Sequence, residues 1–367
     1  MSRRSWILIG ILLVTLTLIA VYVYRYTNKR PNPLSLIPQH AAMVWHITKF
    51  PEKWERFRQD DLWKDLKAGH SYFQDLDKRM QLMDLLLAKD SLKRSYPENI
   101  ITSFHCTGTD QFDVLFFVPL DKEEEKQTFS SIIEEIKEEG RYRIDKRVFN
   151  KYEIYEIIPA KERSGFSYIL YKNIIIGSFT GFLIEDVIRV IEEEARPFRS
   201  KINTAVAESG EALIQVNYLQ LPRFLGLFTK KEYRPALDGL NLLADYSVGD
   251  GHYNRDQVLF SGYSYLNKYS YLNCFKGQPA SKSWIRKYLP INAGVLYYFG
   301  FKNGKQLNQS LEQYWELHND TLQLNSRKIL SEANEDFVDS FTDLLGKELV
   351  IAHLETSDPG KTDKVLY

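Results

Sequence analysis

The feature that most constrains the fold is a short phrase that occurs twice in the chain. The stretch "IPQHAAMVWHITKF" begins at Ile37, and "YLPINAGVLYYFGF" begins at Tyr288. A long helical pattern follows each phrase, and then "ENIITSFH" from Glu98 is echoed by "ELVIAHLE" from Glu348. Because the matched segments keep their order and nearly the same spacing, we interpret them as an internal duplication of a strand, long helix, strand, strand unit.

The spacing of apolar residues within this unit changes from a period of two residues to a period of about 3.6 residues. Met43, Trp45 and Ile47 alternate with the residues between them, which predicts a strand buried on at least one side. After Pro51 the apolar residues recur at spacings of three and four, which predicts long helices packed on a core. Strand pairs then alternate with helices along the chain. This order predicts an α+β fold with mostly antiparallel sheets and long packed helices.

Turn residues punctuate the predicted strands. Hairpin turns are expected at Asn150–Lys151 and Lys172–Asn173, and a third at Gly249–Gly251. Thr180 is expected to cap a helix over residues 182–196.

An apolar segment precedes this fold. The stretch from Trp6 to Tyr24 contains no charged residue, and about 20 apolar residues suffice to cross a membrane as a helix. Bulky residues follow it instead of a small-residue cleavage site, so we expect an uncleaved transmembrane helix. Arg3 and Arg4 favour a cytoplasmic N-terminus and an extracytoplasmic body, on the periplasmic or cell-surface side, although Arg25 and other basic residues follow the span.

These observations predict a domain organisation. Residues 1–5 would form a cytoplasmic head, 6–26 a transmembrane anchor and 27–35 a proline-containing linker. Residues 36–285 would form the extracytoplasmic α+β domain, the first copy of the unit, and residues 286–367 a partial second copy. This second copy would either be short and lend its strands to the first or, as we favour, be truncated.

Composition excludes some partners and leaves others open. The 48 basic residues balance 48 acidic ones, so no nucleic-acid partner is expected. The membrane is an expected partner through the N-terminal helix, and an envelope protein is a second. Cys106 and Cys274 could pair in an oxidising compartment, but buried unpaired thiols are the more common arrangement in such apolar segments.

The opening phrase and the later stretch "YILYKNIIIGSFTGFLIEDVIRVI" carry a resemblance to a known family. Together they resemble exported, membrane-anchored bacterial proteins that contain a domain of unknown function. The resemblance spans most of residues 33–276. It implies an extracytoplasmic α+β body, and it supplies no catalytic residue.

No established catalytic motif is present in the sequence. His40 and His46 lie six positions apart in a predicted strand, which favours ordinary core or surface histidines over a site. The "GSFTG" stretch at 177–181 lacks a lysine and predicts a helix cap rather than a phosphate loop, and the acids at 245–257 do not follow calcium-loop spacing. We therefore expect no cofactor, no metal and no catalytic residue.

The segment "YLQLPRFLGLFTKK", residues 218–231, concentrates apolar side chains beside lysines. An interfacial helix or a hydrophobic ligand site would use Leu221, Phe224, Leu225 and Phe228 for lipid or partner contact, whereas ordinary core packing is the simpler explanation. Two functions from different classes remain. The first is a non-enzymatic binding or envelope-assembly module, and the alternative is an envelope hydrolase or lipid-handling protein with a site that the sequence does not reveal.

Overall fold

The computed structural model describes residues 31–366 except 70, 88–98, 121–122, 139, 163–164, 199–211, 255–256, 278–286, 321–327, 329–344 and 356–361. The chain divides into two compact units. The first contains the chain up to Leu237 together with Ser247–Tyr263, and the second contains Asp238–Tyr246 and Ser264–Tyr367. These units are defined by packing and the predicted copies by sequence similarity, so the predicted boundary at residue 285 stays a prediction.

The first unit is built on a sheet of ten strands in the order β10-β9-β8-β1-β2-β3-β7-β6-β5-β4. Each neighbouring pair from β8 to β4 is antiparallel. The strands are β1 (Met43–Thr48), β2 (Asn99–Cys106), β3 (Phe112–Pro119), β4 (Tyr142–Phe149), β5 (Tyr152–Pro159), β6 (Phe166–Tyr171), β7 (Ile174–Ser178), β8 (Ala212–Asn217), β9 (Tyr246–Asn254) and β10 (Gln257–Tyr265).

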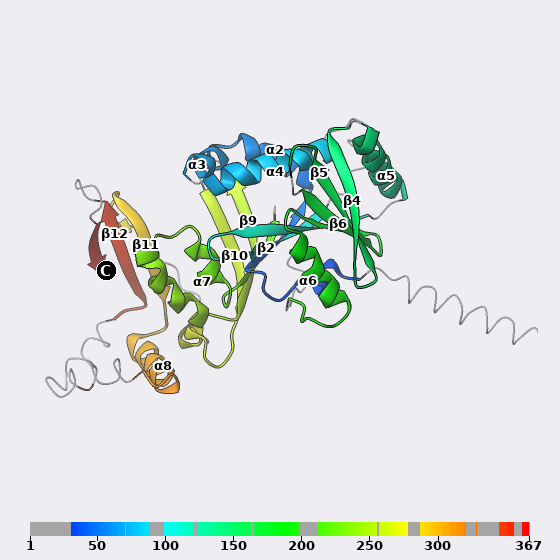
Figure 1. The fold of residues 1–367 in the computed structure, drawn as a ribbon. Helices are drawn as coiled ribbons and strands as arrows, with labels where there is room; N and C mark the ends of the chain where they lie inside the picture. Colours follow the sequence, from blue (N-terminus) through cyan, green and yellow to red (C-terminus); the bar gives the residue numbers. More distant parts are fainter. Residues whose placement is uncertain are drawn as a thin grey trace, which may run out of the picture. The chain divides into compact units, whose positions relative to one another are not determined.

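Helices cover both faces of this sheet (Figure 1). One face packs against α2 (Phe50–Gln59), α4 (Ser71–Leu87), α5 (Glu123–Glu138) and α7 (Leu221–Gly226), with α3 (Asp61–Gly69) in the same layer. The opposite face packs against η1 (Pro33–Leu36) and α6 (Gly181–Ile191). The sheet thus separates two hydrophobic cores, and we call these sides the α2–α4 face and the α6 face.

Two of the three predicted hairpin turns are confirmed. Asn150, Lys172 and Asn173 have positive φ angles, which tight hairpin turns require and which asparagine tolerates. The turn expected at Gly249–Gly251 is wrong, because these residues lie inside β9. A Cβ atom on Gly249 would lie 2.8 Å from the backbone oxygen of Ser261, so this glycine permits the close approach of β10.

The second unit contains a three-stranded sheet in the order β11-β12-β13. Its strands are β11 (Ala293–Gly300), β12 (Glu348–Glu355) and β13 (Thr362–Leu366), and its helices are the 3-10 segment η4 (Tyr271–Phe275) and α8 (Gly304–Leu317). Cys274, Phe301 and Leu307 form its buried centre. Both cysteines have free thiols, and Cys274 lies in η4 rather than in a strand.

The two predicted copies share strand order but not register. In each, the first strand pairs with the second and the second with the third, all antiparallel. Trp45 lies opposite Thr102, whereas Tyr297, its match in the second phrase, lies opposite Ile351 and not opposite Ala352, the match of Thr102. The duplication itself stays a prediction.

The predicted fold class is corrected on one point. The structure is α+β with a large antiparallel sheet, but no helix in the described ranges is both long and apolar enough to cross a membrane. The transmembrane helix expected at residues 6–26 lies outside the described residues. The described fold therefore consists of the sheets and the helices that pack on them.

Candidate functional site

The α2–α4 face of the ten-stranded sheet is apolar along its central strands. Met43, Trp45 and Ile47 of β1 all point to this face, because successive side chains of a strand point to opposite sides. Trp45 lies opposite Thr102 of β2 on one side and Ile214 of β8 on the other. Three adjacent strands therefore form a continuous surface for the helices to cover.

Aromatic side chains link the helices that cover this face. The Trp54 ring of α2 lies 5.6 Å from the Trp63 ring of α3 and 6.1 Å from the Phe50 ring, measured between centroids. Trp63 Nε1 donates a hydrogen bond of 2.9 Å to Asp77 Oδ1, which joins α3 to α4. The helix layer is thus held by ring contacts and by a partly buried indole hydrogen bond.

A cavity of 410 Å³, the apolar cavity, lies between this face and the helices. Ligand pockets in proteins typically measure about 300–1,000 Å³ and are predominantly apolar. Its lining is largely aliphatic and aromatic, and includes Met43, Trp45, Ile47, Trp54, Phe57, Leu62, Trp63, Leu66, Leu76, Phe104, Phe112, Ile214, Phe224 and Phe228. The cavity therefore has the size and chemistry of a binding site.

The polar groups on the wall of the apolar cavity are few, and they include His252. Trp45 Nε1, Trp54 Nε1 and Thr102 Oγ1 are buried and have no hydrogen-bond partner. Lys53 and Arg56 of α2 also line the cavity. Buried polar atoms without partners are rare in folded proteins, so three of them around one cavity favour a ligand that carries a hydrogen-bond acceptor.

Two of the four contact residues predicted in and after α7 line the apolar cavity. Phe224 is 5% exposed, and it lines the apolar cavity together with Phe228. Leu225 is half-buried against the same core, and Leu221 begins the helix without lining the cavity. Phe224 and Phe228 therefore face the interior, which fits a ligand cavity better than a membrane surface.

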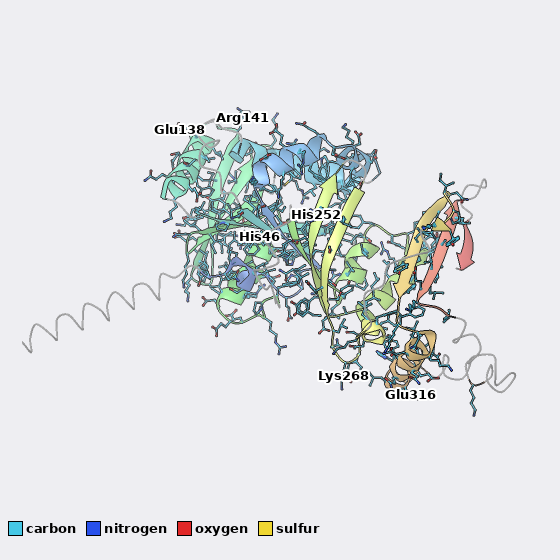
Figure 2. All side chains as sticks on the ribbon, turned by 180° about the vertical axis from the view of Figure 1, so that it is seen from behind. His46, Glu138, Arg141, His252, Lys268 and Glu316 are labelled. Carbon is cyan, nitrogen blue, oxygen red and sulfur yellow. The ribbon has the colours of Figure 1, made fainter. Side chains whose placement is uncertain are left out.

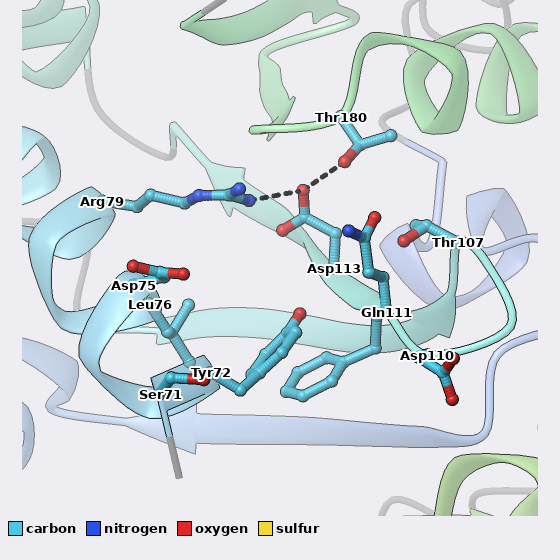
Figure 3. Close-up of a pocket in the computed structure, with 11 residues that line it drawn as sticks. Ser71, Tyr72, Asp75, Leu76, Arg79, Thr107, Asp110, Gln111, Asp113 and Thr180 are labelled. Carbon is cyan, nitrogen blue, oxygen red and sulfur yellow. Dashed lines mark hydrogen bonds and ion pairs between the residues drawn. The ribbon is translucent and has the colours of Figure 1, made fainter. Parts of the chain in front are cut away.

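A second, polar cavity of 270 Å³ adjoins the first, since Leu76 and Phe112 line both. Figure 3 shows its side chains, which come from α4, the loop between β2 and β3, the start of β3, and Thr180 just before α6. Hydroxyl, carboxylate and amide groups dominate its wall, which includes Ser71, Tyr72, Asp75, Arg79, Thr107, Asp110, Gln111, Asp113 and Thr180.

Asp113 is the most buried charged group of the polar cavity, with its side chain 2% exposed. Burial raises the pKa of this carboxyl, against the lowering effect of hydrogen bonds from the Thr180 hydroxyl and the Val114 N–H and of the Arg79 charge. Arg79 Nη1 lies 3.6 Å from Asp113 Oδ2 (Figure 3). Thr180 does precede α6 as predicted, but its side chain bonds Asp113 and makes no capping hydrogen bond.

The described histidines do not supply an accessible catalytic set. Ser103 Oγ lies 2.8 Å from His105 Nε2, as in a hydrolase dyad, but both side chains are 0% exposed and neither lines the apolar or the polar cavity. Figure 2 shows His46 and His252 on strands β1 and β9, which β8 separates. A nucleophile must touch its substrate, so the Ser103–His105 pair does not support the hydrolase hypothesis.

Sequence reasoning missed the wall of the apolar cavity. Trp54, Trp63 and Leu66 were expected to pack as an ordinary helical core, and Thr102 carried no signal at all. The available clue was the presence of two tryptophans and several phenylalanines in short helices, because tryptophan side chains carry an N–H that a closed core must satisfy.

Comparisons with known proteins add little to this geometry. No family model matches the chain, and no curated protein matches it. Two solved structures that match are crystal form I of TP0453, with a TM-score of 0.33, 10% identity and coverage of 63% of this chain and 77% of that chain, and crystal form III of TP0453, with a TM-score of 0.33, 11% identity and coverage of 67% and 84%. At these values the likeness assigns neither fold nor function, and the resemblance to exported bacterial proteins stays a prediction.

Proposed function

We propose that this protein is a non-enzymatic binding module whose apolar cavity holds the hydrocarbon chain of a lipid-type ligand. The observation that carries the proposal is the 410 Å³ cavity between the sheet and α2–α4, lined almost entirely by apolar side chains. Such a site binds hydrocarbon by removing its surface from water, at about 25 cal/mol for each Å². This function combines the binding module with the lipid handling that the sequence left as alternatives.

The cavity wall has a route to solvent. Leu62 of α3 is 37% exposed and Phe260 of β10 is 60% exposed, and both line the apolar cavity. A ligand therefore need not unfold the core to enter. Short helices joined by side-chain contacts, such as α2 and α3, are also the elements that open at low energetic cost.

A cavity-filling substitution tests the proposal. Leu66 of α3 lines the cavity, so Leu66→Trp would place a larger apolar side chain in the space a ligand chain needs. We expect the affinity of the full chain for the neutral fluorescent probe N-phenyl-1-naphthylamine to fall at least about tenfold, or about 1.4 kcal/mol.

The matched control is Leu219→Trp, because Leu219 is 72% exposed and lies outside the cavity wall. This variant should bind the probe as the wild type does. If Leu66→Trp folds and binds the probe with unchanged affinity, or if the wild type does not bind it, the apolar cavity is not a ligand site. The predicted extracytoplasmic location and envelope partner are separate proposals that this experiment leaves open.

A further inference from the structure

We infer that the ligand of the apolar cavity is a single-chain carboxylate amphiphile, such as a fatty acid, whose head lies at the Lys53 end of the cavity. The inference rests on the proposed function, since it names the chemical class of the ligand. It follows from the charges, the orphaned hydrogen-bonding atoms and the direction of the cavity along the strands.

The charges on the cavity wall have one sign. Lys53 and Arg56 line the cavity, whereas none of the described residues on its wall is acidic. Both cations lie on α2, three positions apart, so they share one side of the helix. Glu52 and Glu55 of the same helix are exposed and do not line the cavity. The described part of the wall therefore carries two cationic side chains and no acidic one, which suits an anionic head.

The orphaned polar atoms also select an acceptor. Trp45 Nε1 and Trp54 Nε1 can only donate hydrogen bonds, and the Thr102 hydroxyl can donate one. Trp45 and Thr102 lie opposite each other on the sheet, and Trp54 directly follows Lys53 on α2. An ionised carboxylate accepts hydrogen bonds only, so it complements every donor of this set.

The strands give the cavity a direction. Lys53 Nζ donates to Thr48 Oγ1 at 3.1 Å, which places the ammonium group at the end of β1, next to Ile47. From the Ile47–Ile100 pair to the Cys106–Phe112 pair, β2 advances six residues, or about 20 Å at about 3.3 Å per residue. One leaflet of a bilayer has about 15 Å of hydrocarbon, half of the roughly 30 Å core.

Aromatic rings in edge-to-face contact line the tail end of the cavity. The centroids of Phe112 and Phe224 lie 5.1 Å apart, and those of Phe224 and Phe228 lie 5.5 Å apart. A chain that begins between Trp45 and Lys53 would therefore end against the aromatic side chains Phe112, Phe224 and Phe228. The ligand thus has room for one extended chain and one anionic head.

Three ligands with the same chain and different heads test the inference. Dodecanoate, dodecan-1-ol and dodecyltrimethylammonium are titrated below their micelle concentrations against the full chain in detergent-free buffer, by displacement of N-phenyl-1-naphthylamine. We expect dodecanoate to bind about tenfold more tightly than the alcohol, and the cation to bind least, because charge-assisted hydrogen bonds are about twice as strong as neutral ones. Equal binding of the acid and the alcohol overturns the carboxylate inference and leaves the proposed function standing, whereas no binding of any of the three overturns both.

A charge-removing variant shows whether the α2 cations cause the preference. Lys53→Met with Arg56→Met keeps the apolar stems and removes both charges, so the acid-to-alcohol preference should fall to about one while alcohol affinity is retained. Lys64→Met is the matched control, because Lys64 is exposed on α3 and lies outside the cavity wall. A preference that survives the double substitution assigns the head to another place and overturns the inference.

Thr102→Val separates a ligand role from a structural one. The substitution keeps the shape and removes a buried hydroxyl that has no partner, so the free protein should melt at the same or a higher temperature. Dodecanoate affinity should nevertheless fall about threefold while dodecan-1-ol loses less. A fall in melting temperature with unchanged dodecanoate affinity would show that the hydroxyl serves the fold, and would contradict its assignment to the ligand head.

Discussion

The two faces of the ten-stranded sheet are built from the same strands and are filled to different degrees. On the α6 face, Leu183, Ile184, Val187 and Ile188 are all 0% exposed and pack with the sheet in one core. On the α2–α4 face, the helices leave the 410 Å³ apolar cavity. Because alternate residues of each strand serve both faces, the difference arises from the covering helices.

The covering helices differ in side-chain shape. Helix α6 presents branched aliphatic residues at positions three and four apart, which fill the gaps between strand side chains closely. Helices α2 and α3 present large rings, such as Trp54, Phe57 and Trp63, which contact one another within the helix layer. The closely packed face holds the fold together, and the open face offers space for a ligand.

The largest expected effect is a difference between the same substitution on the two faces. Leu183→Ala on α6 should lower the free energy of unfolding by about 3 kcal/mol, since it opens a void in a filled core. Leu76→Ala on α4 should cost only about 1 kcal/mol, because Leu76 already borders both cavities and has fewer packing partners to lose. Urea unfolding of both variants, followed by circular dichroism, measures the difference.

Equal costs for Leu183→Ala and Leu76→Ala would show that the apolar cavity is filled in solution by rearrangement of α4. The contrast between the faces would then be wrong. Added dodecan-1-ol provides a check within the same experiment, because a ligand that binds the folded state should raise the stability of the wild type and of Leu183→Ala alike.

The strands and hairpins of this fold could be predicted from sequence because short-range chemistry fixes them. Asn150 and Asn173 accept the positive φ angles of their turns, and period-two alternation identifies β1. Gly249 was misassigned to a turn, because a glycine that permits close strand approach looks the same in sequence as a glycine in a turn.

The candidate site could be predicted only in part. Periodicity indicates that Phe224 and Phe228 face inward, and the structure places both on the cavity wall. It does not indicate how completely the facing helices fill the space, since that depends on contacts between α2, α3 and β8 that are far apart in sequence. Thr102 was invisible for the same reason, because its missing partner is a property of the assembled face.

A smaller effect is expected from two neighbouring hydroxyls on opposite faces of β2. Ser103 Oγ satisfies His105 Nε2 on the α6 face, so Ser103→Ala should cost about 1–3 kcal/mol by leaving a buried ring nitrogen without a partner. Thr102→Val on the α2–α4 face should cost nothing, since its hydroxyl has no partner to lose. Thermal unfolding of the two single variants side by side measures the contrast, and a destabilised Thr102→Val would contradict the description of its hydroxyl as unpaired.

The smallest expected effect is the pH dependence of the stability that the α6 face contributes. His105 is 0% exposed, its Nδ1 has no partner, and its ring centroid lies 4.8 Å from that of His40, which itself lies beside Asp186. Burial first, and then the charge of a protonated His40, lower the pKa of His105 well below its usual 6.5.

The sign of the effect follows from where the proton binds. The unfolded chain takes up a proton on His105 near pH 6.5 while the folded chain does not, so stability is full above that pH and declines as the pH falls below it. The slope of stability against pH should reach at most about 1.4 kcal/mol per pH unit for this residue.

Two variants test this assignment. Thr102 on the α2–α4 face has no titratable group, so Thr102→Val should keep the wild-type slope. His105→Gln should flatten the dependence of the urea midpoint between about pH 6.5 and pH 5, leaving the part due to His40 and His46, whose pKa values burial also lowers. An unchanged slope in His105→Gln would show that this histidine is protonated or hydrated in the folded protein, and that the α6 face is less closed than its packing indicates.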